Sequence, residues 1–505
     1  MVKMLLTVIF GASTLYLIWW ILWIAMQHNK YDHIPGPKRA SFFLGNLKLM
    51  ATETIKAGNL GSFFLDLTLE FGDVFVLWRA TLPTVVTCDL PAVKEYYTNL
   101  KLFKKPKQGY LNLSRIGQTS FLGNHSILSD AGGPNWERKK RIMDPGFKIS
   151  RLQEHISKFY VIGEQVADDL EKAQIENGFV DFAKVIAPYT IHAISSAGFS
   201  VISDEKLKQL SDGATVIADH WVTQFKSSNF FSRTRLAEIL GMDGPSRPVA
   251  EKQLKYLREL GKQLILDRVE SGNFGKANDA LDFIIRSNEE NGELNMKLSV
   301  DDFMTMYEAG NVTTATTLSF FIAQMTRNVD CLEKLIREVD EIWVGRGISR
   351  NSSNQDIVAA LKDMVYLDAV INETLRIHPP VTVGNRILQH DMKIQNYAIP
   401  AGVAFTVSQQ VMHHHPQFWK DPDIFNPDRF LHSKDIIPFT FVPFIVGPRR
   451  CLGKNFAILE MKVFISIWLS RLTFEKSSSS KEEILTEQSL LVRMLDTKTI
   501  VKMRG

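Results

Sequence analysis

The sequence predicts a mainly helical protein with a small β-rich region, placed behind an N-terminal membrane-spanning helix. Helix-length runs with mixed apolar and charged faces fill the centre of the 505-residue chain. These runs cover residues 152–175, 207–226, 250–271 and 279–290. Short strand-like segments occur early and again after Pro380, at residues 74–78, 84–87, 397–399 and 403–406. The third observation is an uncharged apolar run near the N-terminus.

That apolar run, residues 4–26, is as long as a helix needs to be to cross a bilayer. More basic residues follow it than precede it, which places the downstream chain in the cytoplasm. A cleaved signal peptide is the competing interpretation, but it has a shorter apolar core and a small-residue cleavage site. We therefore expect a retained single-pass anchor over 1–30, a stiff proline-rich hinge over 31–44, and one large domain over 45–505.

Composition and charge bear on the partners, the cellular environment and the number of domains. The net charge of +4 is too small to indicate a nucleic-acid partner. Three cysteines, Cys88, Cys331 and Cys451, are too few and odd in number for a disulfide framework, which fits a reducing cytosolic environment. The chain has no Gly/Ser-rich linker and no internal repeat, so a single large domain is favoured.

Cys451 is the strongest candidate functional residue. It is framed by Phe444, Gly447, Arg449 and Gly453, just before a helix-like apolar run. A cysteine binds a metal ion as a thiolate, and the positive N-terminal end of a following helix favours that ionised form. The glycines allow backbone amides to approach the sulfur, and the arginine suits an acidic heme propionate. A buried structural cysteine is the alternative, but five agreeing positions favour a thiolate ligand of heme iron.

This loop resembles the cysteine loop of the cytochrome P450 family, and further family motifs follow in the expected order along nearly the whole chain. The resemblance implies a triangular helical fold over 45–505, heme b with Cys451 as its axial ligand, and a monooxygenase activity. It also implies dioxygen, electrons from NADPH through NADPH–cytochrome P450 reductase, and an endoplasmic reticulum membrane location. Within the family, the likeness is greatest to microsomal members of the cholesterol 24-hydroxylase type. It is carried by residues 31–37, 136–147, 338–342 and 441–463.

A long central helix is predicted at 299–328, starting at a capping-box-like Ser-Val-Asp-Asp sequence. In the family, the middle of this helix passes over the heme and hosts dioxygen. The resemblance therefore implies that Ala309 and Gly310 line the cofactor, and that Thr313, with Thr314 beside it, relays protons. A threonine hydroxyl satisfied by a carbonyl one turn back is the alternative. Together with the cysteine loop, the position of Thr313 favours the relay.

One position departs from the family pattern. Val312 stands where an acidic residue usually precedes the relay threonine, and a valine cannot shuttle protons. Protons then reach the bound oxygen by another route, or oxygen activation is slow and consumes electrons without forming product. A third reading is a heme-thiolate isomerase or dehydratase that acts on a lipid hydroperoxide without a reductase. Glu308 lies one turn before Val312, and we do not transfer the proton-relay role to it. A non-catalytic heme- or lipid-binding protein is a further alternative.

The remaining motifs concern cofactor retention. Glu373 and Arg376 share a helix face and alone would be a solvated surface pair. The resemblance groups them with Arg429 in a buried structural network on the thiolate side of the heme. It also assigns heme propionates to Trp136, to Lys140, where arginine is usual, and to Arg386. Arg141 is an alternative to Lys140.

The sequence also suggests partners. A basic cluster of Arg138, Lys139, Lys140, Arg141 and Lys454 is expected to form the face on which an acidic electron donor docks. The substrate-facing segments, by analogy 108–122, 210–231 and 489–493, are apolar. They favour a lipophilic substrate that partitions from membrane lipid, with a sterol first and a fatty acid or xenobiotic second.

Overall fold

The computed structural model describes residues 2–106, 115–116, 119–123, 125–201, 203–226, 246–488 and 491–504. The helices are α1 (Val2–Tyr31), α2 (Leu47–Lys56), α3 (Leu60–Phe71), α4 (Leu90–Thr98), α6 (Pro134–Met143), α7 (Ile149–Leu152), α8 (Ile156–Asn177), α9 (Phe182–Ala193), α10 (Asp204–Lys226), α12 (Ser246–Glu270), α13 (Ala280–Ser287), α14 (Met296–Met325), α15 (Val329–Glu338), α16 (Asn354–Asp363), α17 (Val365–Ile377), α18 (Gln409–His414), α19 (Asp428–Leu431) and α20 (Lys454–Arg471). The strands are β1 (Val74–Arg79), β2 (Leu82–Thr87), β3 (Phe103–Lys104), β4 (Arg115–Ile116), β5 (Thr119–Ser120), β6 (Val180–Asp181), β7 (Glu289–Glu290), β8 (Glu293–Leu294), β9 (Val383–Leu388), β10 (Met392–Ile394), β11 (Tyr397–Ile399), β12 (Ala404–Ser408), β13 (Leu472–Lys476), β14 (Thr486–Gln488), β15 (Val492–Met494) and β16 (Lys498–Met503).

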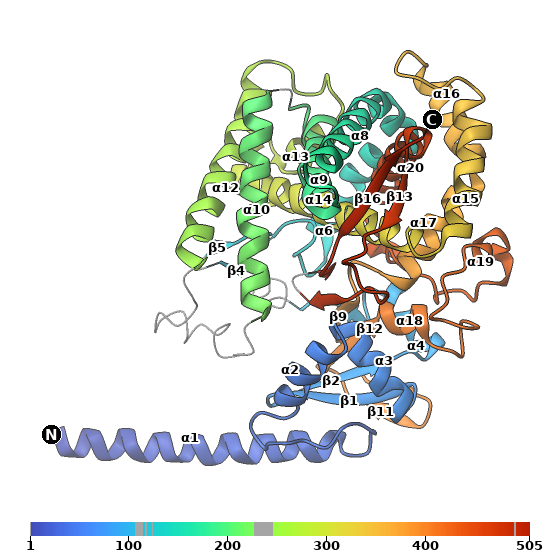
Figure 1. The fold of residues 1–505 in the computed structure, drawn as a ribbon. Coiled ribbons are helices and arrows are strands. Elements are labelled where there is room, and N and C mark those ends of the chain that lie inside the picture. Colours follow the sequence, from blue (N-terminus) through green and yellow to red (C-terminus); the bar gives the residue numbers. More distant parts are fainter. Residues whose placement is uncertain are drawn as a thin grey trace.

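The chain forms a large helical body and a smaller β-rich region, as the sequence predicts (Figure 1). Helix α14 runs through the helical body, where it packs against α9, α12 and α17. Two hydrophobic cores follow this division: one lies among the helices, and the other lies beneath the largest sheet. The predicted fold class is therefore confirmed.

The largest sheet joins distant parts of the chain. Its strand order is β1-β2-β12-β9-β3, with β2 and β12 parallel and the other pairs antiparallel. Val85 of β2 pairs with Phe405 of β12, and both side chains are fully buried. Burial on both strands explains their near-continuous apolar sequence. The sheet therefore joins residues 74–104 to residues 383–408, which precede the cysteine loop.

Helix α1 extends away from the sheet region as a single rod (Figure 1). Over Phe10–Tyr31 it is long and apolar enough to cross a membrane, by length and composition. Its C-terminal end is different, because Ile24 and Tyr31 are buried and the His28 ring lies edge-on to Trp78, with centroids 4.6 Å apart. The following segment is held to β1, where Val76 N–H donates to the carbonyl of Pro35 at 2.8 Å. Helix α1 thus ends on the folded domain itself.

Some predicted boundaries are wrong. The central helix begins at Met296, and the side chain of Asn295 caps it by accepting from Leu298 N–H at 3.2 Å. The Ser299 hydroxyl instead donates to the Asn295 carbonyl inside the first turn, so the expected capping box at Ser299 is incorrect. The run at 279–290 ends as a helix at Ser287, because a short hairpin of β7 and β8 follows. The run at 152–175 corresponds to helix α8, which starts later, at Ile156, and ends at Asn177.

Candidate active site

The cysteine loop is a tight turn that closes on itself just before α20. The Cys451 N–H donates to the Phe444 carbonyl at 2.8 Å. Gly447 has φ = 76°, and a Cβ there would lie 2.4 Å from the carbonyl oxygen of Tyr97, so only glycine fits against α4. Ile445 also adopts a positive φ of 58°, which is strained for a β-branched residue. The loop geometry is therefore imposed by the surrounding packing.

The Cys451 thiol lies at the N-terminus of α20. Burial raises its pKa, whereas hydrogen bonds from the backbone N–H groups of Gly453 and Lys454 and the charges of Lys140 and Lys454 act in the opposite direction. Despite this enclosed setting, the cysteine keeps accessible surface. Backbone donors and nearby cations stabilise a thiolate, and accessible surface leaves room for the group it would bind. The residues here suit a metal-bound sulfur.

Helix α14 is mostly buried after its first turn, but its middle keeps accessible surface. Every residue from Ser299 to Glu308 and from Thr317 to Met325 is buried. Between them, accessible surface remains on Ala309, Gly310, Val312, Thr313, Ala315 and Thr316. Four of these, Ala309, Val312, Thr313 and Thr316, lie on one helix face, which we call the accessible stripe. An interior helix with such a stripe borders an internal space, as the expected dioxygen and heme site requires.

The two threonines of the motif differ in environment. The Thr313 hydroxyl donates to the Ala309 carbonyl at 2.8 Å, which is the arrangement weighed as the alternative to a proton relay. Thr314 is 2% exposed and its hydroxyl donates to the Gly310 carbonyl at 3.3 Å. Gly310 faces Ile194, since a Cβ there would meet that side chain at 2.9 Å. Thr313 and Ala309 therefore belong to the accessible stripe, whereas Thr314 and Gly310 do not, and the relay remains a prediction.

Trp136 and Arg449, expected at the propionates, lie together. The Arg449 guanidinium sits over the Trp136 ring, 3.6 Å from its centroid. The indole N–H donates to the Ile127 carbonyl at 3.0 Å. Arg386, on β9, is 3% exposed and lies over the ring of Tyr96 at 5.2 Å. The guanidinium groups of the buried Arg386 and the half-buried Arg449 suit acidic groups of a ligand.

Lys105 is a site residue that the sequence analysis missed. It is 7% exposed, and its ammonium donates to the Leu128 carbonyl at 2.5 Å. Burial lowers its pKa well below the usual value, and the charges of Arg386 and Arg449 add to this effect, with Asp130 opposing it. Three basic side chains near one another suit a cofactor that carries two carboxylates. Its sequence context, a basic run after β3, gave no sign of burial.

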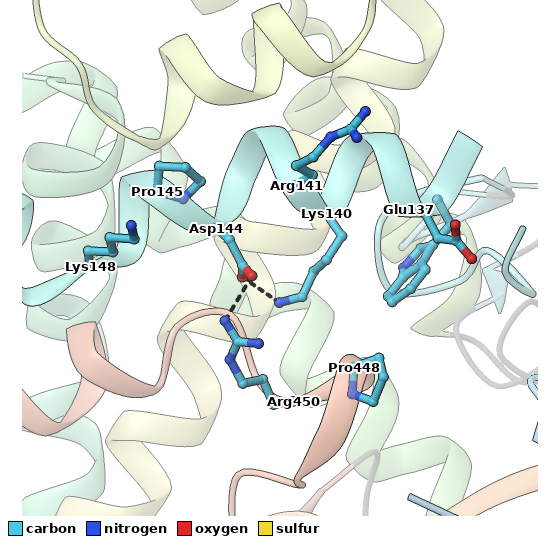
Figure 2. A pocket seen from close by; sticks show the side chains of 9 residues that line it. Glu137, Lys140, Arg141, Asp144, Pro145, Lys148, Pro448 and Arg450 are labelled. Carbon is cyan, nitrogen blue, oxygen red and sulfur yellow. Dashed lines mark hydrogen bonds and ion pairs between the residues drawn. The ribbon is translucent and has the colours of Figure 1, made fainter. Parts of the chain in front are cut away.

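Lys140 lies on the thiolate side, where its ammonium is 2.7 Å from a carboxylate oxygen of Asp144 (Figure 2). The other oxygen of Asp144 accepts from Arg450 at 2.8 Å, which ties α6 to the cysteine loop. Arg141 projects from the opposite side of α6 (Figure 2). The contact of Lys140 or Arg141 with a propionate therefore remains a prediction, and Asp144 is the partner that the structure gives to Lys140.

The basic cluster expected around α6 does not form one face. Lys139 is 3% exposed and pairs with the buried Asp302 at 2.8 Å. Arg138 pairs with Glu290 at 2.7 Å. The prediction of a docking face from these residues is wrong for Lys139, because its ammonium is needed to neutralise an acid inside the protein. Burial of that kind is not visible in a run of four basic residues.

The structural network forms around Glu373, which is fully buried. Arg376 donates to both oxygens of Glu373, at 2.7 and 2.8 Å. The Arg429 guanidinium lies 3.4 Å from the same carboxylate, and the Asn426 N–H donates to it at 2.8 Å. Arg376 also donates to the carbonyl of His413 at 2.9 Å. These side chains join α17, α18 and the segment around α19, so they brace the approach to the cysteine loop.

The substrate-facing segments are only partly described. Residues 108–114, 117–118, 227–231 and 489–490 lie outside the described residues. The segments therefore remain predictions for those positions. Thr305 donates to the Leu122 carbonyl at 3.1 Å, so the described end of the first segment lies against α14.

Comparisons with known proteins agree with this geometry. The sequence model described as "Cytochrome P450" matches residues 35–503. The chain is 25% identical to a probable cytochrome P450 4s3 of Drosophila melanogaster, over 94% of this chain and 95% of that protein. It is 27% identical to cytochrome P450 3A2 of Rattus norvegicus, over 92% and 90%, and 24% identical to a cytokinin hydroxylase of Arabidopsis thaliana, over 82% and 78%. The chain belongs to the cytochrome P450 family of monooxygenases, whose cofactor is a heme with a cysteine thiolate as axial ligand.

Proposed function

We propose that this protein is a membrane-anchored monooxygenase that hydroxylates a sterol, with electrons from NADPH delivered by NADPH–cytochrome P450 reductase. The observation that carries the proposal is the position of the Cys451 thiol at the start of α20, where two backbone N–H groups donate hydrogen bonds to its sulfur. Family membership supports the reaction class. The choice of a sterol rests on the likeness of the scaffold segments and the apolar substrate-facing segments.

The chain's own residues divide the work. When bound, heme ligated by a thiolate supplies the oxygen-activating chemistry. Cys451 would ligate it, and Arg449, Arg386 and Lys105 would hold its acidic groups. Trp136 would fix the Arg449 guanidinium through the stack of these two side chains. The Thr313 hydroxyl would leave the Ala309 carbonyl to hold a water that carries a proton.

The anchor supports an endoplasmic reticulum location with the catalytic domain in the cytoplasm. From Val2 to Trp23, before the buried Ile24, α1 is about 33 Å long at roughly 1.5 Å per residue, close to a bilayer core. The Trp20 ring stacks on exposed Phe43 with centroids 5.5 Å apart. Aromatic side chains of this kind suit the membrane interface. The exposed apolar residues beside the anchor would then also contact lipid.

The surface for the electron donor is proposed around the pocket in Figure 2, a hollow of about 470 Å³ between α6 and the cysteine loop. Arg141, Lys148 and Arg450 line it and are exposed, and Lys454 is exposed at the start of α20. Pro448 and Arg450 lie on either side of Arg449, and Arg450 directly precedes Cys451. A protein docked here would therefore face the thiolate side. Acidic groups on a reductase would complement these cations.

The test combines binding and turnover. A sterol panel is added to the purified full-length protein, and displacement of water from the iron is followed by absorbance. Sterols that bind are then incubated with the reductase, NADPH and dioxygen, and products are identified. A hydroxylated sterol that requires all three supports the proposal. Binding and product from fatty acids alone would overturn the choice of sterol.

Val312 favours one second candidate, the isomerase or dehydratase that acts on a lipid hydroperoxide. Its side chain lies in the accessible stripe, where it offers no proton. Conversion of a lipid hydroperoxide without reductase, together with no NADPH-dependent hydroxylation, would favour this candidate. Loss of hydroperoxide conversion when reductase is withheld would exclude it.

A further inference from the structure

Glu308 is a buried acid without a partner among the residues that the structure describes. It is 8% exposed and sits on α14 directly before the accessible stripe. Within the described part of the chain its carboxyl makes no hydrogen bond or ion pair. Two other buried acids of the same helix differ in this respect, since Asp301 lies 2.5 Å from Arg258 and Asp302 lies 2.8 Å from Lys139. Glu308 is the member of the three that α14 leaves uncompensated.

An uncompensated carboxyl is costly. Burial raises the pKa of Glu308 to about 7, with no other cause acting on it. A buried polar group that lacks a hydrogen bond destabilises the fold, and an ionised one destabilises it more. Such a cost is explained when the missing partner belongs to a ligand. No charged side chain of the described residues supplies that partner.

The helix geometry places Glu308 beside the reaction space rather than at the proton relay. Four residues separate it from Val312, so both lie on adjacent positions of one ridge. Side chains of an α-helix lean toward its N-terminus, which directs the Glu308 carboxyl toward Thr305 and away from Thr313. The neighbouring faces are occupied, since Tyr307 donates to the Leu210 carbonyl and Asn311 accepts from the Thr190 hydroxyl at 2.8 Å. The carboxyl is thus displaced from the oxygen-activating end of the stripe toward the substrate end.

We propose that Glu308 is a substrate-recognition residue, whose carboxyl binds a hydrogen-bond-donating group, a hydroxyl or a protonated amine, on an otherwise apolar substrate. That contact would hold one polar end of the substrate about a helix turn from Thr313 and so select the carbon that reaches the heme. The inference rests on the proposed function only in requiring a lipophilic substrate, and it does not require a sterol.

The experiment measures binding to the ferric full-length holoenzyme, without reductase, for four variants: wild type, E308Q, E308L and the control E341Q. Glu341 is an exposed acid, so its change removes a carboxylate far from the stripe. The ligands are a long-chain alcohol and its methyl ether, and a long-chain amine and its N-acetyl derivative. The same pairs are made on a 3β-substituted sterol. Equilibrium dialysis is used throughout, because an amine that reaches the iron would change the spectrum directly.

In the wild type and E341Q, the alcohol and the amine should bind at least tenfold more tightly than their capped derivatives. E308L should lose that difference for both, while E308Q should keep most of it for the alcohol and lose it for the amine. If the substitutions weaken binding of only the alcohol or only the amine, the group that Glu308 recognises is assigned to that class. Equal binding of donor and capped ligands in the wild type, or an unchanged difference in both variants, would overturn the proposal. If E308L fails to retain heme, the amine pair with E308Q decides alone.

The long-chain pairs separate this inference from the sterol assignment. Should no sterol bind or react, the alcohol and amine comparison still tests Glu308. If donor and capped ligands bind equally well while a sterol is hydroxylated, the proposed function is retained and the recognition role of Glu308 is rejected.

Discussion

The Arg449 guanidinium lies 3.6 Å from the centroid of the Trp136 ring, so the arginine of the cysteine loop is stacked on helix α6. A cation over an indole contributes about 0.5–2 kcal/mol, depending on how far it is desolvated. The contact joins two motifs that lie more than 300 residues apart in the sequence. We therefore expect heme retention to depend on Trp136, a residue that does not ligate iron.

Trp136→Ala should raise the rate of heme loss about tenfold, equivalent to about 1.4 kcal/mol, because Arg449 loses its support. Trp136→Phe keeps an aromatic face and should lose heme more slowly than the alanine variant. Heme transfer to an excess of apomyoglobin measures both rates. Equal rates in the two variants and the wild type would show that the stack does not hold Arg449 for the cofactor.

Glu373→Gln should destabilise the fold by about 3–5 kcal/mol, since the fully buried Arg376 would be left with an uncompensated charge and the half-buried Arg429 would lose its ion pair. The exposed Glu341→Gln serves as the control and should change stability by less than about 0.5 kcal/mol. Urea unfolding followed by circular dichroism gives both values. A Glu373 variant as stable as its control would contradict the structural role of the network.

Thr313→Ala should consume NADPH and dioxygen with little product, because the proposed water-holding hydroxyl lies in the accessible stripe. Thr314→Ala is the matched comparison, since that hydroxyl is buried and bonded to the Gly310 carbonyl. Its ratio of product to NADPH should stay near that of the wild type. Unchanged coupling in Thr313→Ala would remove the relay, and uncoupling in Thr314→Ala alone would move it to the second threonine.

Acid should destabilise the protein through His378. Its ring stacks on Phe320 and its Nε2 lies 2.7 Å from the Gln324 side chain. Burial, and then the neighbouring His414, Arg376 and Arg327, lowers its pKa from 6.5 to about 3. The unfolded chain therefore binds the proton more readily, so stability is full above about pH 6.5 and falls as the pH drops toward 3.

The size of that effect follows from the same shift. At pH 5.5 the loss should be about 1.4 kcal/mol for this histidine. His378→Gln removes the titrating group and should make the fall in unfolding free energy between pH 7 and 5.5 shallower by about that amount. Urea unfolding across this range checks it, and parallel curves for variant and wild type would assign the acid sensitivity to other groups.

Local patterns in the sequence were enough to predict the positions of the helices and strands that have strong hydrophobic periodicity. Helix α20 and strands β1 and β11 lie where the sequence predicts them, because their apolar runs are bounded by clear breaks. The start of α14 was misplaced because Asn295 and Ser299 are both good capping residues, and packing selects between them.

Burial was the property that sequence could not supply. The spacing of Glu373 and Arg376 predicts a shared helix face, but only the resemblance indicated that the pair lies inside the protein. Lys105 and Lys139 are basic residues in ordinary basic runs, yet one lies beside Arg386 and Arg449 and the other neutralises Asp302. Their partners come from distant segments, so no local pattern distinguishes them from surface lysines.

Ligation of heme iron by the Cys451 sulfur is tested most directly by the absorbance of the reduced, carbon monoxide-bound protein, compared between the wild type, Cys451→Ser and the control Cys331→Ser. The wild type and Cys331→Ser should show the red-shifted Soret band of thiolate-ligated heme, and Cys451→Ser should lose both that band and monooxygenase activity. Retention of the band in Cys451→Ser, or its absence from heme-loaded wild type, would contradict the account.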